Sequence, residues 1–453
     1  MFRLAAVFAF CTIPALSAAP AAPPVPRDAQ ATLQFDPQIA TNAWLATVPA
    51  AAKAKSDAYF EGGYWLMLWD FLYSAGIMVL LLETGLSARM RDFSERIAAK
   101  YWMRAYLYAI QFLLITAILS FPLALYEGFL RERQYGLMNQ SFGGWFRDQV
   151  VGLCVMLVLA PPVIAVLFVL VRRLSRTWHL WGSAVAVLFT MFVALIAPIY
   201  IAPLFNTYKP LQNETIKSQI LSLASENGIP AKDVYEVDAS RQSKRVSANV
   251  SGLFGTERIT LNDNLLNRCS PQAILSVMGH EMGHYAMHHV RNFILFACIT
   301  ITVLFGLLRW LLQRSLAYGS MRWHVRAMDD VAILPLAVLI LTILSFLFTP
   351  ISNTFTRTQE YEADIFGLNA ARQPDGEAEA DLLLGEYRKL DPGPLEEFVF
   401  FDHPSGRTRI YAAMRWKAEN LCLFDLSLPC RVPAPNATVA PTGPSQPSEI
   451  WHR

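Results

Sequence analysis

Residues Ser270–His289 read SPQAILSVMGHEMGHYAMHH and contain the pattern His-Glu-x-x-His. Serine followed by proline is typical of a helix start, with serine as N-cap and proline at the first helical position. Positions four apart share one face of a helix, so His280 and His284 can direct their imidazoles at one cation. Glu281 lies about 100° round the helix, where it can reach a water at the metal rather than the metal itself. This stretch alone leaves open a surface or core helix with a chance pair of histidines.

The composition indicates a membrane protein. Of 453 residues, 54% are hydrophobic and only 16% are charged, whereas soluble proteins carry about 25% charged residues. The formal net charge is +2, which gives no electrostatic reason to expect a nucleic-acid partner.

Six apolar stretches are each near the length that crosses the hydrocarbon layer as a helix. Trp and Tyr cluster at their ends, as residues at the membrane interface do. The predicted spans are Trp65–Leu82, Tyr106–Tyr126, Val150–Val171, Trp181–Ile201, Phe293–Leu312 and Val331–Phe348. We therefore expect a mainly α, polytopic helical membrane protein in contact with the lipid bilayer.

Soluble stretches divide the spans, and we expect two of them to form one small α+β domain that carries the His-Glu-x-x-His pattern. A short apolar run near the N-terminus predicts a signal peptide or a signal anchor. An Ala/Pro-rich linker follows it, with little fixed structure or, as the alternative, a short helix. The predicted division is 1–19 signal, 20–63 linker, 64–205 four spans, 206–290 first part of the metalloprotease domain, 291–350 two spans, 351–430 second part of that domain and 431–453 disordered tail.

Basic residues gather in the loops after the first, third and fifth spans, which fall on one side of the membrane. They are Arg89, Arg91, Arg96, Lys100, Arg104, Arg172, Arg173, Arg176, Arg314, Arg322 and Arg326. The positive-inside rule then places both soluble stretches on the non-cytoplasmic side, which predicts the periplasmic side of a bacterial inner membrane. A disulfide between Cys422 and Cys430 would fit that oxidising compartment.

A catalytic zinc needs a third protein ligand and an open position. Glu360 and Asp364 are four residues apart on a helix expected to emerge from the sixth span. Glu360 can ligate a metal, while Asp364 can accept a hydrogen bond from a ligating imidazole. A solvated acidic helix face is the alternative reading of these two residues.

Several motifs occur in one order along residues 64–415. They are PLFN at 203–206, Ser247-Ala248-Asn249, His-Glu-x-Gly-His followed by Tyr285, NTFTRTQEYEAD at 353–364, and His403-Pro404 with Arg409 beyond it. In these motifs the chain resembles the integral-membrane zinc metalloproteases that include the type I CAAX prenyl protease and, more distantly, HtpX-like proteases. It departs from them in its signal-like first segment, where that family has a seventh span, and in a predicted orientation opposite to the eukaryotic enzymes.

The resemblance implies a role for each matching residue. It implies that one zinc ion per chain is held by His280, His284 and Glu360, with Glu281 as general base. It places Asp364 behind a ligating histidine. His403 and Arg409 are implied to contact the substrate and to steady the developing oxyanion.

Residues 245–263 alternate in a way that predicts strand, turn and strand. The resemblance makes Ser247, Ala248, Asn249 and Val250 an edge strand on which a peptide or protein substrate lies as an added β-strand. A hairpin without a substrate role is the alternative. His288 and His289 are expected to continue the metal helix.

Two classes of function remain open at this point. The first is a membrane-embedded zinc endopeptidase acting on CAAX-type prenylated peptides or on misfolded membrane and envelope proteins. The second is a non-proteolytic transporter or scaffold with a structural metal site. Glu281 argues against the second, because a structural site does not need it.

Overall fold

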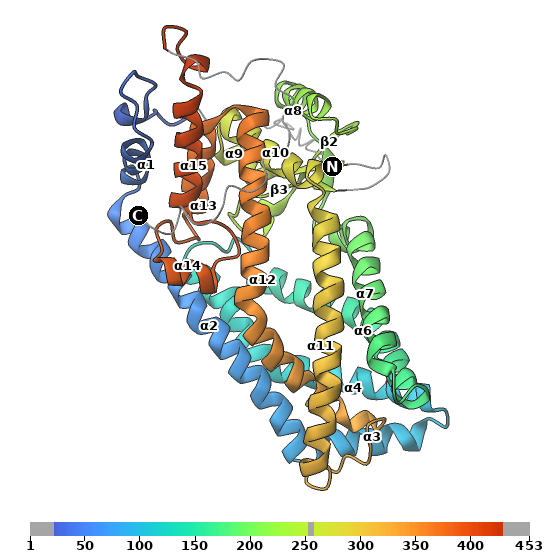
Figure 1. Cartoon of the computed structure of the whole chain (residues 1–453). Helices are drawn as coiled ribbons and strands as arrows, with labels where there is room; N and C mark the ends of the chain where they lie inside the picture. The colour runs from blue at the N-terminus through green and yellow to red at the C-terminus, as the bar shows by residue number, and fades with distance from the viewer. Residues whose placement is uncertain (1–21, 252–257, 429–453) are drawn as a thin grey trace, which may run out of the picture.

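The computed structural model describes residues 22–251 and 258–428. Long helices form one end of the molecule, and a smaller mixed domain forms the other (Figure 1). The signal predicted at 1–19 and the tail predicted at 431–453 lie outside the described residues, as does Cys430.

Within residues 22–251 and 258–428, six helices are long and apolar enough to cross a membrane, which confirms the six predicted spans. Three are extended by short π or 3-10 segments at one end. The spanning helices are α2 (Ala50–Glu83); α4 (Tyr101–Leu125) with η2 (Tyr126–Arg131) and α5 (Glu132–Gln134); α6 (Phe142–Arg173); α7 (Trp178–Ile196) with η3 (Ala197–Ile201) and η4 (Ala202–Leu204); α11 (His289–Gly319); and α12 (Leu334–Ala371), preceded by η6 (Val331–Ile333).

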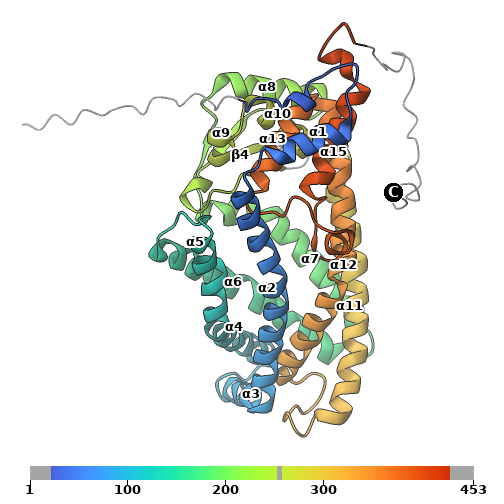
Figure 2. The same ribbon diagram turned by 90° about the vertical axis from the view of Figure 1, so that its left-hand side faces the viewer.

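The spanning helices close a ring. Each contacts the next in the order α2, α4, α6, α7, α11 and α12, and α12 returns to α2. At the end away from the mixed domain, the short helix α3 (Leu86–Ile97) packs against α2, α4 and η6 (Figure 2). There the Ser87 hydroxyl lies 2.6 Å from the Tyr108 hydroxyl and donates to the Ala332 carbonyl at 2.8 Å.

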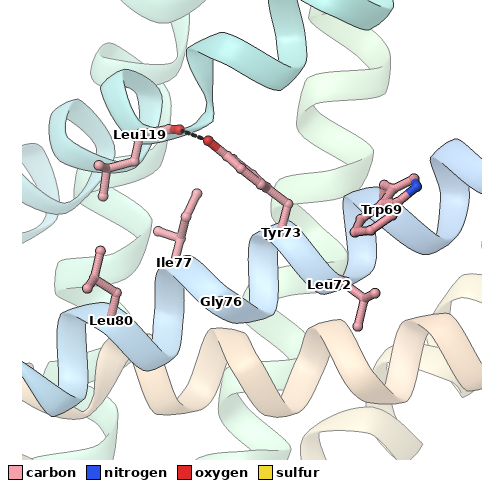
Figure 3. Close-up of a pocket in the computed structure, with 7 residues that line it drawn as sticks. All are labelled: Trp69, Leu72, Tyr73, Gly76, Ile77, Leu80 and Leu119. Atoms are coloured by element: carbon pink, nitrogen blue, oxygen red, sulfur yellow. Dashed lines mark hydrogen bonds between the residues drawn. The ribbon is translucent and has the colours of Figure 1, made fainter.

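The outer face of α2 carries an apolar groove of about 370 Å³ toward α4 (Figure 3). Trp69, Leu72 and Leu80 line it, and the Tyr73 hydroxyl bridges the two helices by donating to the Leu119 carbonyl at 2.9 Å. Its apolar walls suit a helix that contacts hydrocarbon, where polar groups must find partners inside the protein.

The segment 20–63 differs from the expected linker with little fixed structure. It contains η1 (Arg27–Ala29), α1 (Pro37–Ala46) and the first turns of α2. Asp36 caps α1, because its carboxylate accepts from the Gln38 and Ile39 amides. Trp44 is fully buried among residues of α15 (Gly406–Glu419), which anchors α1 to the mixed domain. The alanine run from Ala50 favours helix, so α2 begins well before the predicted span.

The mixed domain contains a four-stranded sheet in the order β1-β2-β4-β3. The strands are β1 (Tyr208–Pro210), β2 (Val234–Val237), β3 (Ala248–Ser251) and β4 (Arg258–Asn262). β4 pairs with β2 in parallel and with β3 in antiparallel register, Ala248 opposite Leu261. The two strands predicted between 245 and 263 are thus confirmed, and β3 lies at the sheet edge.

Helices of the first soluble stretch contact the sheet, and helices of the second pack against them and against α12. They are α8 (Glu214–Glu226), α9 (Asp263–Arg268), α10 (Pro271–Ala286), α13 (Pro374–Leu384), α14 (Pro394–Phe400) and α15, with η5 (Ala239–Arg241) and η7 (Leu421–Leu423). Their core includes Ile220, Ile259, Ile274, Met278 and Met282, all fully buried. α10 packs against α12 and α13, which joins the two soluble stretches into one unit.

Candidate active site

Helix α10 carries the His-Glu-x-x-His pattern, as the sequence predicts. The Ser270 hydroxyl caps it by accepting from the Ala273 amide at 3.2 Å. Glu379 of α13 holds this cap in place, because its carboxylate accepts from both the amide and the hydroxyl of Ser270. The start of α10, and with it the register of its histidines, is therefore fixed by a buried contact.

Glycines let α10 and α12 approach closely. A Cβ atom at Gly367 would lie 2.7 Å from the His280 nitrogen, and one at Gly283 would lie 3.0 Å from the Ala363 Cα. Real Cβ atoms essentially never show the first distance, and the second is tighter than nine in ten real Cβ contacts. The small residues at these positions therefore set the helix separation, which brings the carboxylates of α12 to the histidines of α10.

Three donor groups converge where the helices meet. The Nε2 atoms of His280 and His284 are 3.1 Å apart, and the Glu360 carboxylate lies 3.2 Å from the first and 3.6 Å from the second. A tetrahedral zinc with ligands at about 2.0–2.1 Å separates them by roughly 3.3–3.4 Å. The donor set thus fits a zinc ion in chemistry and in spacing.

The electrostatics of the site favour positive charge. Burial disfavours a charged imidazole, but hydrogen bonds to Asp364 and Glu360 outweigh it and raise the pKa of His280 to about 10. Burial also raises the pKa of Glu281 above its ordinary value, whereas a bound cation would lower it. The buried carboxylates therefore favour the binding of a cation at this point.

A buried ion cluster lies behind His280. The His280 Nδ1 atom is 2.7 Å from Asp364 Oδ1, the arrangement predicted for Asp364. Arg409 donates to Asp364 at 2.5 Å and also contacts Glu377 at 3.2 Å and Asp381 at 3.1 Å. The guanidinium is thus engaged by three carboxylates, a different environment from the substrate contact expected for it.

His284 has a partner that sequence reasoning missed. Helix α10 ends at Ala286, and His288 adopts a left-handed conformation (φ 58°) before α11 starts at His289, so the expectation that both histidines continue the metal helix is wrong. The turn brings His289 Nδ1 to 2.9 Å from His284 Nδ1, and its Nε2 to 3.2 Å from Glu362. Their pairing depends on the turn, which no helical spacing could reveal.

A cavity of about 300 Å³ opens beside the donors. His403 lines it, with Nε2 3.3 Å from Glu360 Oε2 and Nδ1 2.8 Å from Asp402. Ser247 and Ala248 line it too, whereas Asn249 and Val250 lie farther along β3. The structure therefore brings the predicted catalytic and metal residues together with Ser247 and Ala248, whereas it does not bring Asn249 and Val250 to the cavity. Sequence reasoning missed Glu377, Asp381 and Arg388, which also line this cavity.

Two family models match most of the chain. Residues 210–417 match peptidase family M48, and residues 41–207 match the model described as CAAX prenyl protease N-terminal, five membrane helices. Within 41–207, the structure has four helices long and apolar enough to span a membrane.

Individual proteins show the same similarity. The chain is 30% identical over 352 residues to the uncharacterized metalloprotease YhfN of Bacillus subtilis (strain 168), covering 76% of this chain and 82% of that protein. It is 26% identical to CAAX prenyl protease 1 of Saccharomyces cerevisiae, covering 66% and 69%. The crystal structure of S. mikatae Ste24p is similar in fold, with a TM-score of 0.70 and 19% identity over 81% of this chain and 89% of that one.

Proposed function

The chain belongs to peptidase family M48 and is a multi-pass membrane metalloendopeptidase, and on that premise we propose that it is a zinc enzyme with one ion per chain. His280, His284 and Glu360 would hold the ion, and the convergence of their donor atoms is the observation that carries this proposal. A zinc bound there would supply Lewis acidity, lowering the pKa of a water and polarising the scissile carbonyl. Family membership sets aside the transporter or scaffold alternative.

Glu281 is proposed as the general base. Glu281 lines the cavity beside the histidines. A water that attacks the substrate must lie in this cavity, next to the Glu281 carboxylate. As the water oxygen bonds to the carbonyl carbon, Glu281 accepts a proton from that water. It then delivers the proton to the amine nitrogen as the carbon–nitrogen bond breaks.

Two chains of hydrogen bonds would orient the ligating rings. Donation from His280 Nδ1–H to Asp364 leaves its Nε2 lone pair facing the ion. Donation from His284 Nδ1–H to His289, and from His289 Nε2–H to Glu362, does the same for the second ring. Arg409 would act through Asp364, as a positioning residue.

His403 is proposed to steady the charge that develops on the carbonyl oxygen. Asp402 accepts from its Nδ1–H, and its Nε2 points toward Glu360 in the cavity. A protonated His403 would donate from Nε2 to the oxyanion. Arg409 lines the same cavity, but its guanidinium is already paired with three carboxylates, so His403 is the better placed donor.

The free edge of β3 is proposed to bind the substrate as an added strand. Among the residues that the structure describes, β3 pairs with β4 alone, so the N–H and C=O groups of its other edge can pair with a peptide. Main-chain hydrogen bonds can hold an extended peptide of varied sequence there, with Ser247 and Ala248 nearest the donors and Asn249 and Val250 beyond them.

The position of the site supports membrane-associated substrates. From Leu334 to Glu360, α12 rises about 39 Å at 1.5 Å per residue, against about 30 Å of hydrocarbon. A straight helix that starts at one hydrocarbon boundary and crosses without tilt therefore carries Glu360 at most about 10 Å past the other. Both proposed substrate classes, CAAX-type prenylated peptides and misfolded membrane or envelope proteins, present peptide bonds at this depth.

The metalloprotease domain is proposed to lie on the periplasmic side of a bacterial inner membrane. The basic residues of α3 and of the loop after α11 lie at the end opposite the sheet (Figures 1 and 2). Cys422 is disulfide-bonded, which fits an oxidising compartment. A reporter fused after residue 430 should register as non-cytoplasmic, and a cytoplasmic signal would reverse the orientation and favour lipidated cytosolic substrates.

The Glu281→Gln variant tests the proposed chemistry. It keeps the size of the side chain but removes its basicity, so cleavage of a quenched peptide should fall by about 10²- to 10⁴-fold while zinc content stays at the wild-type level. Glu419→Gln, on the exposed face of α15, is the matched control and should change neither. Unaltered cleavage by the Glu281 variant would remove the proposed mechanism.

A further inference from the structure

Arg388 is a cation of the catalytic cavity to which the proposed mechanism gives no task. It lies in the loop between α13 and α14 and is partly buried. Its side chain lines the same cavity of about 300 Å³ as His280, Glu281 and His403. A charged side chain in the wall of an active site faces whatever the site binds.

The loop that carries Arg388 is held from two sides. The Ser56 hydroxyl of α2 donates to the Arg388 carbonyl at 3.1 Å. The Tyr387 hydroxyl reaches the Val246 carbonyl, just before β3, at 3.5 Å. Lys389 pairs with Glu61 at 2.6 Å and with Glu396 at 2.8 Å. These contacts place the Arg388 backbone beside the N-terminal end of β3.

The charge of Arg388 is not neutralised by a close partner. Its neighbour Lys389 has two carboxylate partners, and Arg409 across the cavity has three. No carboxylate among the described residues lies within 4.0 Å of the Arg388 guanidinium. The positive charge of Arg388 contributes at longer range to the lowered pKa of Asp402, but the Asp402 carboxylate accepts a hydrogen bond from His403.

The rest of the cavity wall does not repel an anion as strongly as its composition suggests. Glu377 is bonded to Arg409 and to the Ser276 hydroxyl. Asp381 is paired with Arg409 at 3.1 Å, and burial raises its pKa well above its usual range. Of the carboxylates that line the cavity, the two of α13 are therefore paired, while Glu281 and Glu360 stand with the histidines, where a bound cation would offset them.

Strand geometry indicates which part of a substrate would reach Arg388. A peptide that adds antiparallel to β3 runs with its C-terminal end toward the N-terminal end of β3. Val246 and Ser247 mark that end of the strand, and they line the cavity together with Arg388. The residues that follow the scissile bond would therefore lie closest to the guanidinium.

We propose that Arg388 binds a carboxylate of the substrate on the C-terminal side of the cut. The carboxylate is either the peptide's own C-terminus or an acidic side chain within a few residues of the scissile bond, and a guanidinium can hold either with two parallel hydrogen bonds. Arg388 would then select substrates that end, or carry an acid, shortly after the cleaved bond. This inference rests on the proposed peptidase function.

Three quenched peptides of one sequence, cut near their C-terminal end, test the inference. The first has a free C-terminal carboxylate, the second a C-terminal amide, and the third an amide with a glutamate in the last position. The purified full-length protein in detergent should cleave the first about tenfold more efficiently than the second, because a partly exposed charged hydrogen bond is lost. If glutamate in the third peptide restores efficiency, any nearby carboxylate suffices; if it does not, the C-terminus is the ligand.

The Arg388→Ala variant should lose this preference through a higher KM for the free acid, with unchanged kinetics for the amide. Arg388→Lys should keep part of the preference, and Arg415→Ala, which removes an exposed arginine of α15, should keep all of it. Equal losses on acid and amide would show a structural role and overturn the inference. Equal cleavage of acid and amide by the wild type would overturn it too, while leaving the proposed peptidase function intact. Failure to cleave all three peptides would count against that function itself.

Discussion

The close crossing of α10 and α12 makes Gly367→Ala the sharpest test of how the site is built. The new methyl group would lie 2.7 Å from the His280 nitrogen and 3.0 Å from its Cα, and both are backbone atoms that cannot turn aside. Ordinary contact begins near 3.4 Å, so the helices must separate by about 0.7 Å. The Glu360 and Asp364 carboxylates would move by a similar amount relative to the histidines.

A displacement of this size should reduce both metal binding and catalysis. Misplacement of catalytic groups by about 1 Å costs roughly 100-fold in rate, so we expect the kcat/KM of Gly367→Ala to fall by about 10- to 100-fold. Overpacking should also cost about 1–3 kcal/mol of the free energy of unfolding. Zinc affinity, measured by competition with a chromophoric chelator, should weaken in parallel.

The matched control is Gly63→Ala in α2, where an added methyl group meets no atom within 4 Å. Alanine favours helix over glycine, so this variant should keep wild-type activity and unfold no more easily than the parent. If Gly367→Ala bound zinc and cleaved peptide like the wild type, the helix separation would not be what positions Glu360.

Three further perturbations address the metal donors. Glu360→Ala should lower zinc content and cleavage together, and full zinc occupancy in this variant would show that another group is the third ligand. His289→Ala should weaken zinc affinity about 10- to 100-fold, because it removes the partner that orients His284. His289→Gln should recover part of this loss. Equal zinc affinity in the wild type and both variants would refute the orienting role. The pKa of about 10 at His280 means that its proton must leave when zinc binds at neutral pH. Zinc affinity should therefore rise with pH, by up to about tenfold per pH unit below pH 10. Calorimetry of zinc binding at pH 7.5 in buffers of different ionisation enthalpy should detect the released proton. If no proton is released, His280 is not protonated in the metal-free protein.

The elements that the sequence predicts correctly depend on local pattern. Six apolar lengths predict six spanning helices, and alternation over 245–263 predicts β3 and β4. The spacing of His280 and His284 on α10 follows from helix geometry alone. In each case the information lies within twenty or thirty consecutive residues, which is the range over which periodicity acts.

The contacts that the sequence does not reveal depend on turns and on long-range packing. His289 reaches His284 only because His288 reverses the chain in a left-handed conformation. α1 is ordered because Trp44 is buried against α15, a helix near the other end of the chain. Arg409 matches a family motif, but its partners come from α12 and α13 and follow from no spacing.

The buried charges around the site explain why the stability of the site should depend on metal binding. A guanidinium surrounded by carboxylates is seldom more stabilising than well-packed apolar residues, so the Arg409 cluster has no evident value for the fold alone. It holds Asp364 against His280, while Glu360 and Glu281 add negative charge a few ångströms away. Arg409 cannot compensate all of these groups, and a proton on His280 supplies part of the deficit when no ion is bound. A divalent cation supplies more, and exchanging that proton for the ion brings further positive charge to the site while leaving the rings oriented by their partners.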